Sequence, residues 1–105
     1  MIQSETIQAG IVRVTLQGPR LDAAVADTVK SELKGQIDAG ARRLEVDFTN
    51  VQFMDSSGLG ALVGALKLMG SGGQLEIVNP CSTVMKVLRL TRMNKVFIVR
   101  EGPAA

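Results

Sequence analysis

Strand-like and helix-like segments alternate along this 105-residue chain, and this alternation constrains its fold more than any other feature of the sequence. β-branched and apolar residues alternate with polar residues at the strand-like positions. The sequence predicts strands over residues 2–7, 11–16, 44–48, 75–78 and 96–99, the first two paired as a hairpin. Since strands joined through helices are usually parallel neighbours, we expect an α/β domain with a mixed, mostly parallel sheet in the order β-β-α-β-α-β-α-β.

Three helices are predicted between these strands. The first follows Asp22, a good N-cap residue, and continues until Gly40. Its apolar positions recur at helical spacing: Val25 or Ala26, Val29, Leu33 and Ile37. The second, over residues 56–69, is apolar around nearly its whole circumference, so it must be buried or must offer a face to another molecule. The third covers residues 82–90, with Val84, Val87 and Leu88 facing inward.

Core-facing positions follow from the same alternation. In the strand over residues 11–16 the inward side chains are Val12, Val14 and Leu16, and in the strand over residues 44–48 they are Leu44, Val46 and Phe48. The residues between them, Glu45 and Asp47 among others, are expected on the polar face. Residues 50–55 are expected to leave this strand as a loop.

The composition limits what the chain can do. With 46% hydrophobic and 21% charged residues, we expect one packed soluble domain over residues 1–105, with residues 101–105 as a frayed tail. There is no signal-peptide pattern and no apolar run of about 18 residues, so a cytoplasmic location without membrane insertion is expected. Because the chain has no histidine, Ser-His-Asp and Cys-His sites are absent and nearly all zinc sites are excluded. We therefore expect neither an enzyme nor a cofactor, and a half-buried structural role for Cys81.

The segment that differs most from an ordinary α/β sequence is FMDSSGLG at residues 53–60, which leads from a strand into the glycine-containing helix. At a helix N-terminus the first backbone N–H groups lack intrahelical partners and the helix dipole favours an anion. A phosphoryl group on Ser56 would meet these donors, while Asp55, and Asp22 if the fold brings it near, would oppose its charge. The segment therefore indicates a switch at the protein surface.

Two further hypotheses concern this segment. A dianion on Ser56 would disrupt an apolar partner surface made by Met54, Leu59 and the helix backbone exposed at the glycines. Alternatively, the segment is only a helix-capping sequence, in which Asp55 or Ser56 accepts a hydrogen bond from the first turn and Gly58 fits a tight turn. Local chemistry alone favours this alternative.

Two motifs carry a resemblance to a known family. The segment at residues 53–60 resembles the signature of STAS-domain anti-sigma factor antagonists, in which a strand and a loop precede Asp-Ser-Ser-Gly and a helix. The segment GPRLDA at residues 18–23 is similar to the family's Gly-x-Leu-Asp element, with Pro19 or Arg20 as one extra residue. The expected order of elements also matches over nearly the whole chain, so the resemblance implies a single STAS domain.

The resemblance also implies a function. In this family a cognate anti-sigma factor, which is a Ser/Thr kinase of the GHKL type, phosphorylates the serine that matches Ser56. The unphosphorylated form binds this kinase and releases the sigma factor, the phosphorylated form does not bind, and a PP2C-type phosphatase restores it. The free protein is expected to be a monomer. The residues expected at the kinase or partner contact are Asp22, Met54, Asp55, Ser57, Gly58 and Leu59.

Other functions remain as alternatives. Within the same fold, the chain would be a scaffold, a transporter-associated subunit or a partner-switching regulator with an output other than a sigma factor. A small hydrolase using Ser56 lacks a general base. Nucleic-acid binding is not expected, because 12 Lys and Arg against 10 Asp and Glu are spread along the chain and there is no Trp or Tyr. The candidate residues for such binding are Arg42, Arg43, Arg89, Arg92 and Lys95.

Overall fold

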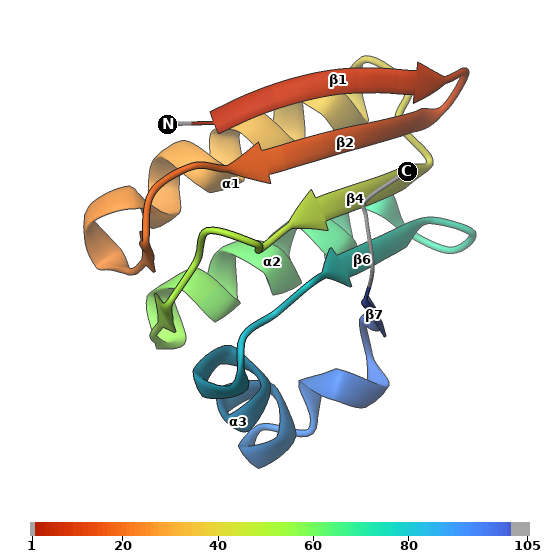
Figure 1. Ribbon diagram of the computed structural model, residues 1–105. Coiled ribbons are helices and arrows are strands. Elements are labelled where there is room, and N and C mark those ends of the chain that lie inside the picture. Colours follow the sequence, from red (N-terminus) through yellow and green to blue (C-terminus); the bar gives the residue numbers. More distant parts are fainter. Residues whose placement is uncertain (1, 102–105) are drawn as a thin grey trace.

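Five strands form one mixed sheet in the order β1-β2-β4-β6-β7 (Figure 1). The computed structural model describes residues 2–101. Within them the sheet strands are β1 (Ile2–Gln8), β2 (Ile11–Leu16), β4 (Arg43–Asp47), β6 (Gln74–Val78) and β7 (Ile98–Arg100). β1 pairs with β2 in an antiparallel hairpin, and the other neighbours are parallel. The predicted α/β fold with a mostly parallel sheet is confirmed.

Helices connect these strands and cover the sheet. They are α1 (Ala23–Asp38), α2 (Ser56–Met69), α3 (Ser82–Leu90) and the short 3-10 helix η1 (Met93–Lys95). Figure 1 shows α1 and α2 behind the same face of the sheet, and these two helices pack against each other. At the end of α1, Gly40 adopts a φ of 109°, which suits a residue without a Cβ and explains why the helix ends there.

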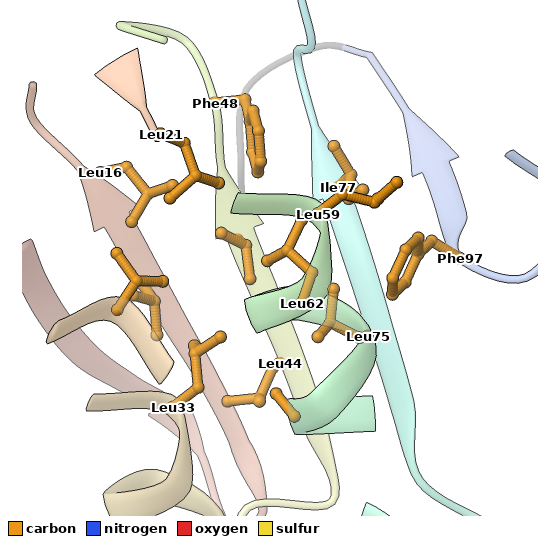
Figure 2. Close-up of a cluster of buried hydrophobic side chains, with 14 of the residues drawn as sticks. Leu16, Leu21, Leu33, Leu44, Phe48, Leu59, Leu62, Leu75, Ile77 and Phe97 are labelled. Carbon is orange, nitrogen blue, oxygen red and sulfur yellow. The ribbon is translucent and has the colours of Figure 1, made fainter. Parts of the chain in front are cut away.

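The hydrophobic core lies between the sheet and the helices α1 and α2 (Figure 2). The sheet contributes the residues that the alternation pattern predicts: Val12, Val14, Leu16, Leu44, Val46 and Phe48, all buried. From the helices, Leu33 and Leu62 reach the same cluster with no exposed surface. In α3, Val84 and Leu88 are buried, whereas Val87 is only half-buried. The predicted core positions in these strands and in α3 are therefore confirmed except for Val87, which packs against the cluster without being fully buried.

The structure differs from the prediction in one unpredicted strand pair and in the bounds of the last strand, whereas the other predicted strand bounds agree to within one residue. Residues 50–55 contain a strand, β5 (Phe53–Met54), which pairs with a second short strand, β3 (Arg20–Leu21). A strand of two residues is too short to show an alternation pattern, so its existence depends on its partner. The last strand begins at Ile98 and not at residue 96, because the N–H of Phe97 donates to Met93 O at 3.0 Å and closes a turn after η1. Of the expected frayed tail, residues 102–105 lie outside the described part of the chain.

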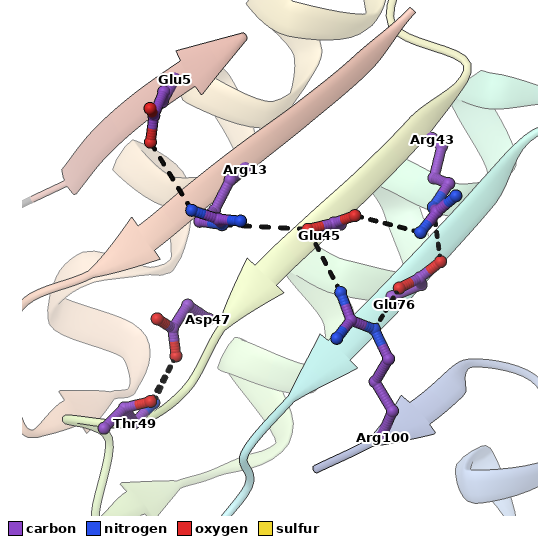
Figure 3. A network of polar contacts seen from close by, with 8 residues as sticks. All are labelled: Glu5, Arg13, Arg43, Glu45, Asp47, Thr49, Glu76 and Arg100. Carbon is purple, nitrogen blue, oxygen red and sulfur yellow. Dashed lines mark hydrogen bonds and ion pairs between the residues drawn. The ribbon is translucent and has the colours of Figure 1, made fainter. Parts of the chain in front are cut away.

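The face of the sheet opposite to α1 and α2 carries a row of charged side chains (Figure 3). Glu45 and Glu76 are directly opposite each other on β4 and β6, and they are only 2% and 4% exposed. Like charges at such positions repel each other. Two arginines bridge them: Arg43 lies 3.1 Å from Glu45 and 2.6 Å from Glu76, and Arg100 lies 3.2 Å and 2.7 Å from the same pair. The sequence pattern placed Glu45 on a polar face but did not predict its burial.

Replacing Glu45 with glutamine is expected to lower the free energy of unfolding by about 1–3 kcal/mol, because its carboxylate contacts Arg13, Arg43 and Arg100. Glu5→Gln is the matched control. Glu5 contacts Arg13 at 3.6 Å, but its side chain is 69% exposed, so we expect a loss below about 0.5 kcal/mol. Urea unfolding of both variants measures the difference, and equal losses would contradict it.

Candidate functional site

The short parallel pair of β3 and β5 brings two distant segments of the chain together. Leu21 is paired with Met54 in this register. Beyond the strands, the N–H of Asp55 donates to Leu21 O at 3.2 Å. Parallel strands end at the same edge, so the residues that follow them, Asp22 and Asp55, start two helices side by side. The fold therefore brings Asp22 close to the start of α2. This is the condition under which Asp22 was expected to oppose the charge of a phosphate on Ser56.

Asp22 caps α1 and is held in a fixed position. One of its carboxylate oxygens, Oδ1, accepts a hydrogen bond from the Ala24 N–H at 3.1 Å, and Oδ2 accepts one from Arg20 Nε at 2.9 Å. The hydrogen bond from the Arg20 guanidinium, together with the backbone N–H of Ala24, holds the pKa of Asp22 below its ordinary value. Asp22 is therefore a permanent negative charge at neutral pH.

Asp55 caps α2, and Ser56 is the first residue of this helix. The Asp55 Oδ1 atom accepts a hydrogen bond from the Gly58 N–H at 3.0 Å. This leaves the N–H groups of Ser56 and Ser57 in the first turn, where they have no intrahelical partner. Both serine side chains are exposed. An exposed hydroxyl beside the positive end of a helix dipole is a suitable acceptor for a phosphoryl group.

Gly58 allows α2 to begin directly against β3. It is buried, and a Cβ atom added to it would collide with the carbonyl oxygen of Leu21 and lie 2.7 Å from Leu21 Cγ. A residue with a side chain would therefore push the start of α2 away from β3. From the sequence, Gly58 was expected to fit a tight turn. In the structure it instead allows a close approach between α2 and β3.

The apolar surface expected from Met54 and Leu59 is not present, because these side chains are only 1% and 8% exposed and belong to the core. Figure 2 shows Leu59 pointing toward the sheet. Since neighbouring residues of a strand point to opposite sides, the burial of Met54 turns Phe53 outward, where it is 37% exposed. The guanidinium of Arg20 lies over the Phe53 ring, 4.5 Å from its centre. Phe53 and Arg20 are therefore surface residues of the site that the sequence analysis missed.

A groove between α1 and α2 continues from the exposed serines. Its lining residues are Ala23, Ala26, Asp27, Lys30, Ser57, Gly60 and Ala61. Lys30 crosses the groove toward Gly64, and a Cβ atom on that glycine would lie 3.2 Å from Lys30 Nζ. Neither Asp27 nor Lys30 was predicted from the sequence as a site residue. The helical pattern of α1 predicts only that Asp27 and Lys30 lie on an outward face. They line the groove beside Ser57 because α1 packs against α2.

The surroundings of Ser56 within residues 2–101 show whether a base or a metal ligand is available there. Ser56 Oγ forms no hydrogen bond among residues 2–101, so no general base contacts it there. The same residues contain no group of three or more acidic or cysteine side chains placed to hold a metal ion. Cys81 is half-buried, as expected. No helix in the described part of the chain has the length and apolar character needed to cross a membrane.

Comparison with known proteins gives a consistent result. The family model for the STAS domain matches residues 4–103. The chain is 30% identical over 95 residues to the anti-sigma F factor antagonist of Paenibacillus polymyxa, which covers 89% of this chain and 80% of that protein. It is 29% identical over 86 residues to the anti-sigma-B factor antagonist of Staphylococcus aureus, with 81% and 80% covered.

A solved structure shows the same architecture. The structure of the anti-sigma factor antagonist SpoIIAA in its unphosphorylated form matches with a TM-score of 0.84 and 25% sequence identity, covering 98% of this chain and 89% of that one. The similarity therefore extends over nearly the whole chain.

Proposed function

The chain belongs to the STAS-domain family of anti-sigma factor antagonists, and from this premise we propose that it binds an anti-sigma factor and that phosphorylation of Ser56 prevents this binding. The observation that carries the proposal is the exposed Ser56 side chain, placed at the start of α2 by the Asp55 cap. The two sequence motifs of the family, at residues 18–23 and 53–60, meet at this point through the pairing of β3 and β5.

The partners follow from the family. We infer that the anti-sigma factor is a Ser/Thr kinase of the GHKL type and that a PP2C-type phosphatase removes the phosphate. In the forward step Ser56 Oγ attacks the γ-phosphorus of ATP, the bond to ADP breaks, and the serine proton passes to a base of the kinase. In the reverse step water hydrolyses the phosphoserine. The partners therefore carry out this chemistry on the chain. We place the protein in the cytoplasm and expect it to be a monomer when free.

The electrostatics of the site explain how one phosphoryl group would act as a switch. The free N–H groups at the start of α2 stabilise a phosphate, while the carboxylates of Asp22 and Asp55 oppose it. Because these two effects oppose each other, the fold stays intact. Phosphorylation nevertheless adds about two negative charges to a surface that already has two. A partner whose surface fits the unmodified form would have to bury these charges without counter-ions, which is costly.

Contact with the partner is proposed for the exposed or half-exposed residues of this surface. Asp22, Asp55 and Ser57 remain from the sequence prediction, and Phe53 and Arg20 are added because they are exposed beside Asp22. Gly58 contributes by holding the helix in place. The buried side chains of Met54 and Leu59 support the site from below.

The phosphorylation step is tested with the purified chain, the GHKL kinase encoded in the same genome and ATP. We expect the mass to increase by one phosphoryl group, located on Ser56 by fragmentation. Ser56→Ala should abolish the modification, whereas Ser71→Ala, at an exposed serine in the turn after α2, should retain it. Incorporation that persists in Ser56→Ala, or no incorporation with a kinase that binds the chain, would refute the assignment of Ser56.

A further inference from the structure

The positive charge of the chain is concentrated near its C-terminal end. Residues 79–100 contain five basic side chains and no Asp or Glu, and the rest of the chain is net negative. This segment forms α3, η1 and β7, which are consecutive along the chain and in contact with one another. Figure 1 shows α3 and β7 at the edge of the sheet opposite to β1. The basic residues of this segment are therefore grouped on the elements at this edge of the sheet.

Most of these basic side chains have no acidic partner. Arg100 pairs with the glutamates of the sheet, but Lys86, Arg89, Arg92 and Lys95 are exposed and form no ion pair within residues 2–101. At helical spacing Lys86 and Arg89 share the outward face of α3, since Val84 and Leu88 occupy the buried face. These four exposed cations therefore lie on consecutive elements without an acidic partner.

Apolar side chains are exposed in the same segment. Leu90 in α3 and Val96 directly after η1 are 76% and 50% exposed. Ile98 is 42% exposed as well, but it is in register with Glu76 and so lies on the sheet face of the glutamates. We name the surface made by Lys86, Arg89, Leu90, Arg92, Lys95 and Val96 the α3 surface. Exposed apolar groups together with unpaired cations are typical of a binding surface.

We propose that the α3 surface is a second contact for the anti-sigma factor and that it binds acidic side chains with apolar neighbours on that partner. This inference rests on the proposed function. Charge complementarity selects an acidic partner. The two exposed aliphatic groups, Leu90 and Val96, favour a protein over a nucleic acid, since the surface offers no exposed aromatic ring for base stacking. A nine-residue helix with Leu90 as its large outward apolar residue is a poor membrane anchor.

The position of α3 makes a shared partner feasible. Its N-cap residue Cys81 contacts the segment that precedes β5, with Sγ 3.7 Å from Gln52 O. From there β5 carries the exposed Phe53 and leads directly to Ser56. A partner that covers Phe53 and Ser56 therefore needs only to extend along α3 to reach Arg89 and Leu90.

The test compares charge reversals at equivalent positions of two helices. Arg89 lies in the last turn of α3 and Lys67 lies in the last turn of α2, and both are exposed and without an ion pair within the described residues. Binding of the purified anti-sigma factor is measured by calorimetry for the wild type, Ser56→Glu, Arg89→Glu, Leu90→Ser and Lys67→Glu. We expect Arg89→Glu and Leu90→Ser to weaken binding about 10-fold and Lys67→Glu to leave it unchanged. Raising the salt should reduce the effect of Arg89→Glu and not that of Leu90→Ser.

Each result decides between the proposals. If Ser56→Glu abolishes binding but Arg89→Glu and Leu90→Ser behave as Lys67→Glu does, the α3 surface is no contact and the proposed function stands. If the wild type does not bind the anti-sigma factor, the proposed function and this inference both fail. Binding of duplex DNA or of phosphatidylglycerol vesicles that Arg89→Glu abolishes would assign the α3 surface to another class of partner and overturn the inference. Equal circular dichroism spectra and melting temperatures of the variants show that the fold is unchanged.

Discussion

Replacing Gly58 with alanine is expected to lower the free energy of unfolding by about 1–3 kcal/mol or more. In a helix this substitution normally stabilises by up to about 1 kcal/mol. Here the new Cβ would collide with the carbonyl oxygen of Leu21 and lie 2.9 Å from its carbonyl carbon, and backbone atoms cannot move aside as a flexible side chain can. Either β3 or the start of α2 must shift, and a shift there would separate Ser56 from Asp22.

Gly60 provides the matched control for this prediction. It lies one position beyond Leu59 in the same helix and is exposed, and a Cβ atom on it would meet nothing within 4 Å. We expect Gly60→Ala to be neutral or to stabilise the fold by up to about 1 kcal/mol. Urea unfolding of both variants gives the comparison. A Gly58→Ala variant as stable as Gly60→Ala would show that α2 does not need the close approach to β3.

Phosphorylation of Ser56 is expected to weaken binding to the anti-sigma factor by about 100-fold or more. Placing like charges together in an interface costs several kcal/mol, and about 1.4 kcal/mol corresponds to each factor of ten. The phosphate would stand beside Asp22, whose lowered pKa keeps it ionised at neutral pH, and beside the capping carboxylate of Asp55. The fold itself should remain, because the first-turn N–H groups of α2 stabilise the phosphate.

The measurement is calorimetric titration of the anti-sigma factor with the phosphorylated and unphosphorylated chain, together with the melting temperature of each. Ser71→Glu serves as the control for added charge, since Ser71 is exposed in the turn after α2, at the opposite end of that helix from Ser56. We expect this variant to bind as the wild type does. Equal affinities of the phosphorylated and unphosphorylated chain would contradict the proposed switch. A large loss of stability on phosphorylation would show that phosphorylation acts by unfolding the chain.

Much of the fold could be predicted because its signals are local. The alternation at Val12, Val14 and Leu16 identifies a core strand, and the same three residues are buried. Asp22 was expected to cap the first helix from its residue type and the apolar spacing that follows, and it does. These signals depend on residues close in sequence, so no knowledge of the remaining fold was needed.

The candidate site was predictable in its position but not in its surface. Ser56 was expected at the start of a helix, and the structure places it there, but Met54 and Leu59 point into the core. The direction of a side chain on a two-residue strand depends on which partner strand it meets, which local sequence does not encode. For the same reason Phe53 and its contact with Arg20 could not be foreseen.

The five strands of the main sheet, the three helices with their apolar faces, and the start of a helix at Ser56 all follow from local sequence. The pairing of β3 with β5, the position of Asp22 beside Asp55, the contact of Gly58 with a strand and the burial of Glu45 depend on the folded chain. The difference lies in the range of the interactions. Helix caps and alternating patterns act over a few residues, whereas strand pairing, close backbone approach and burial of charge depend on segments that meet only when the chain has folded.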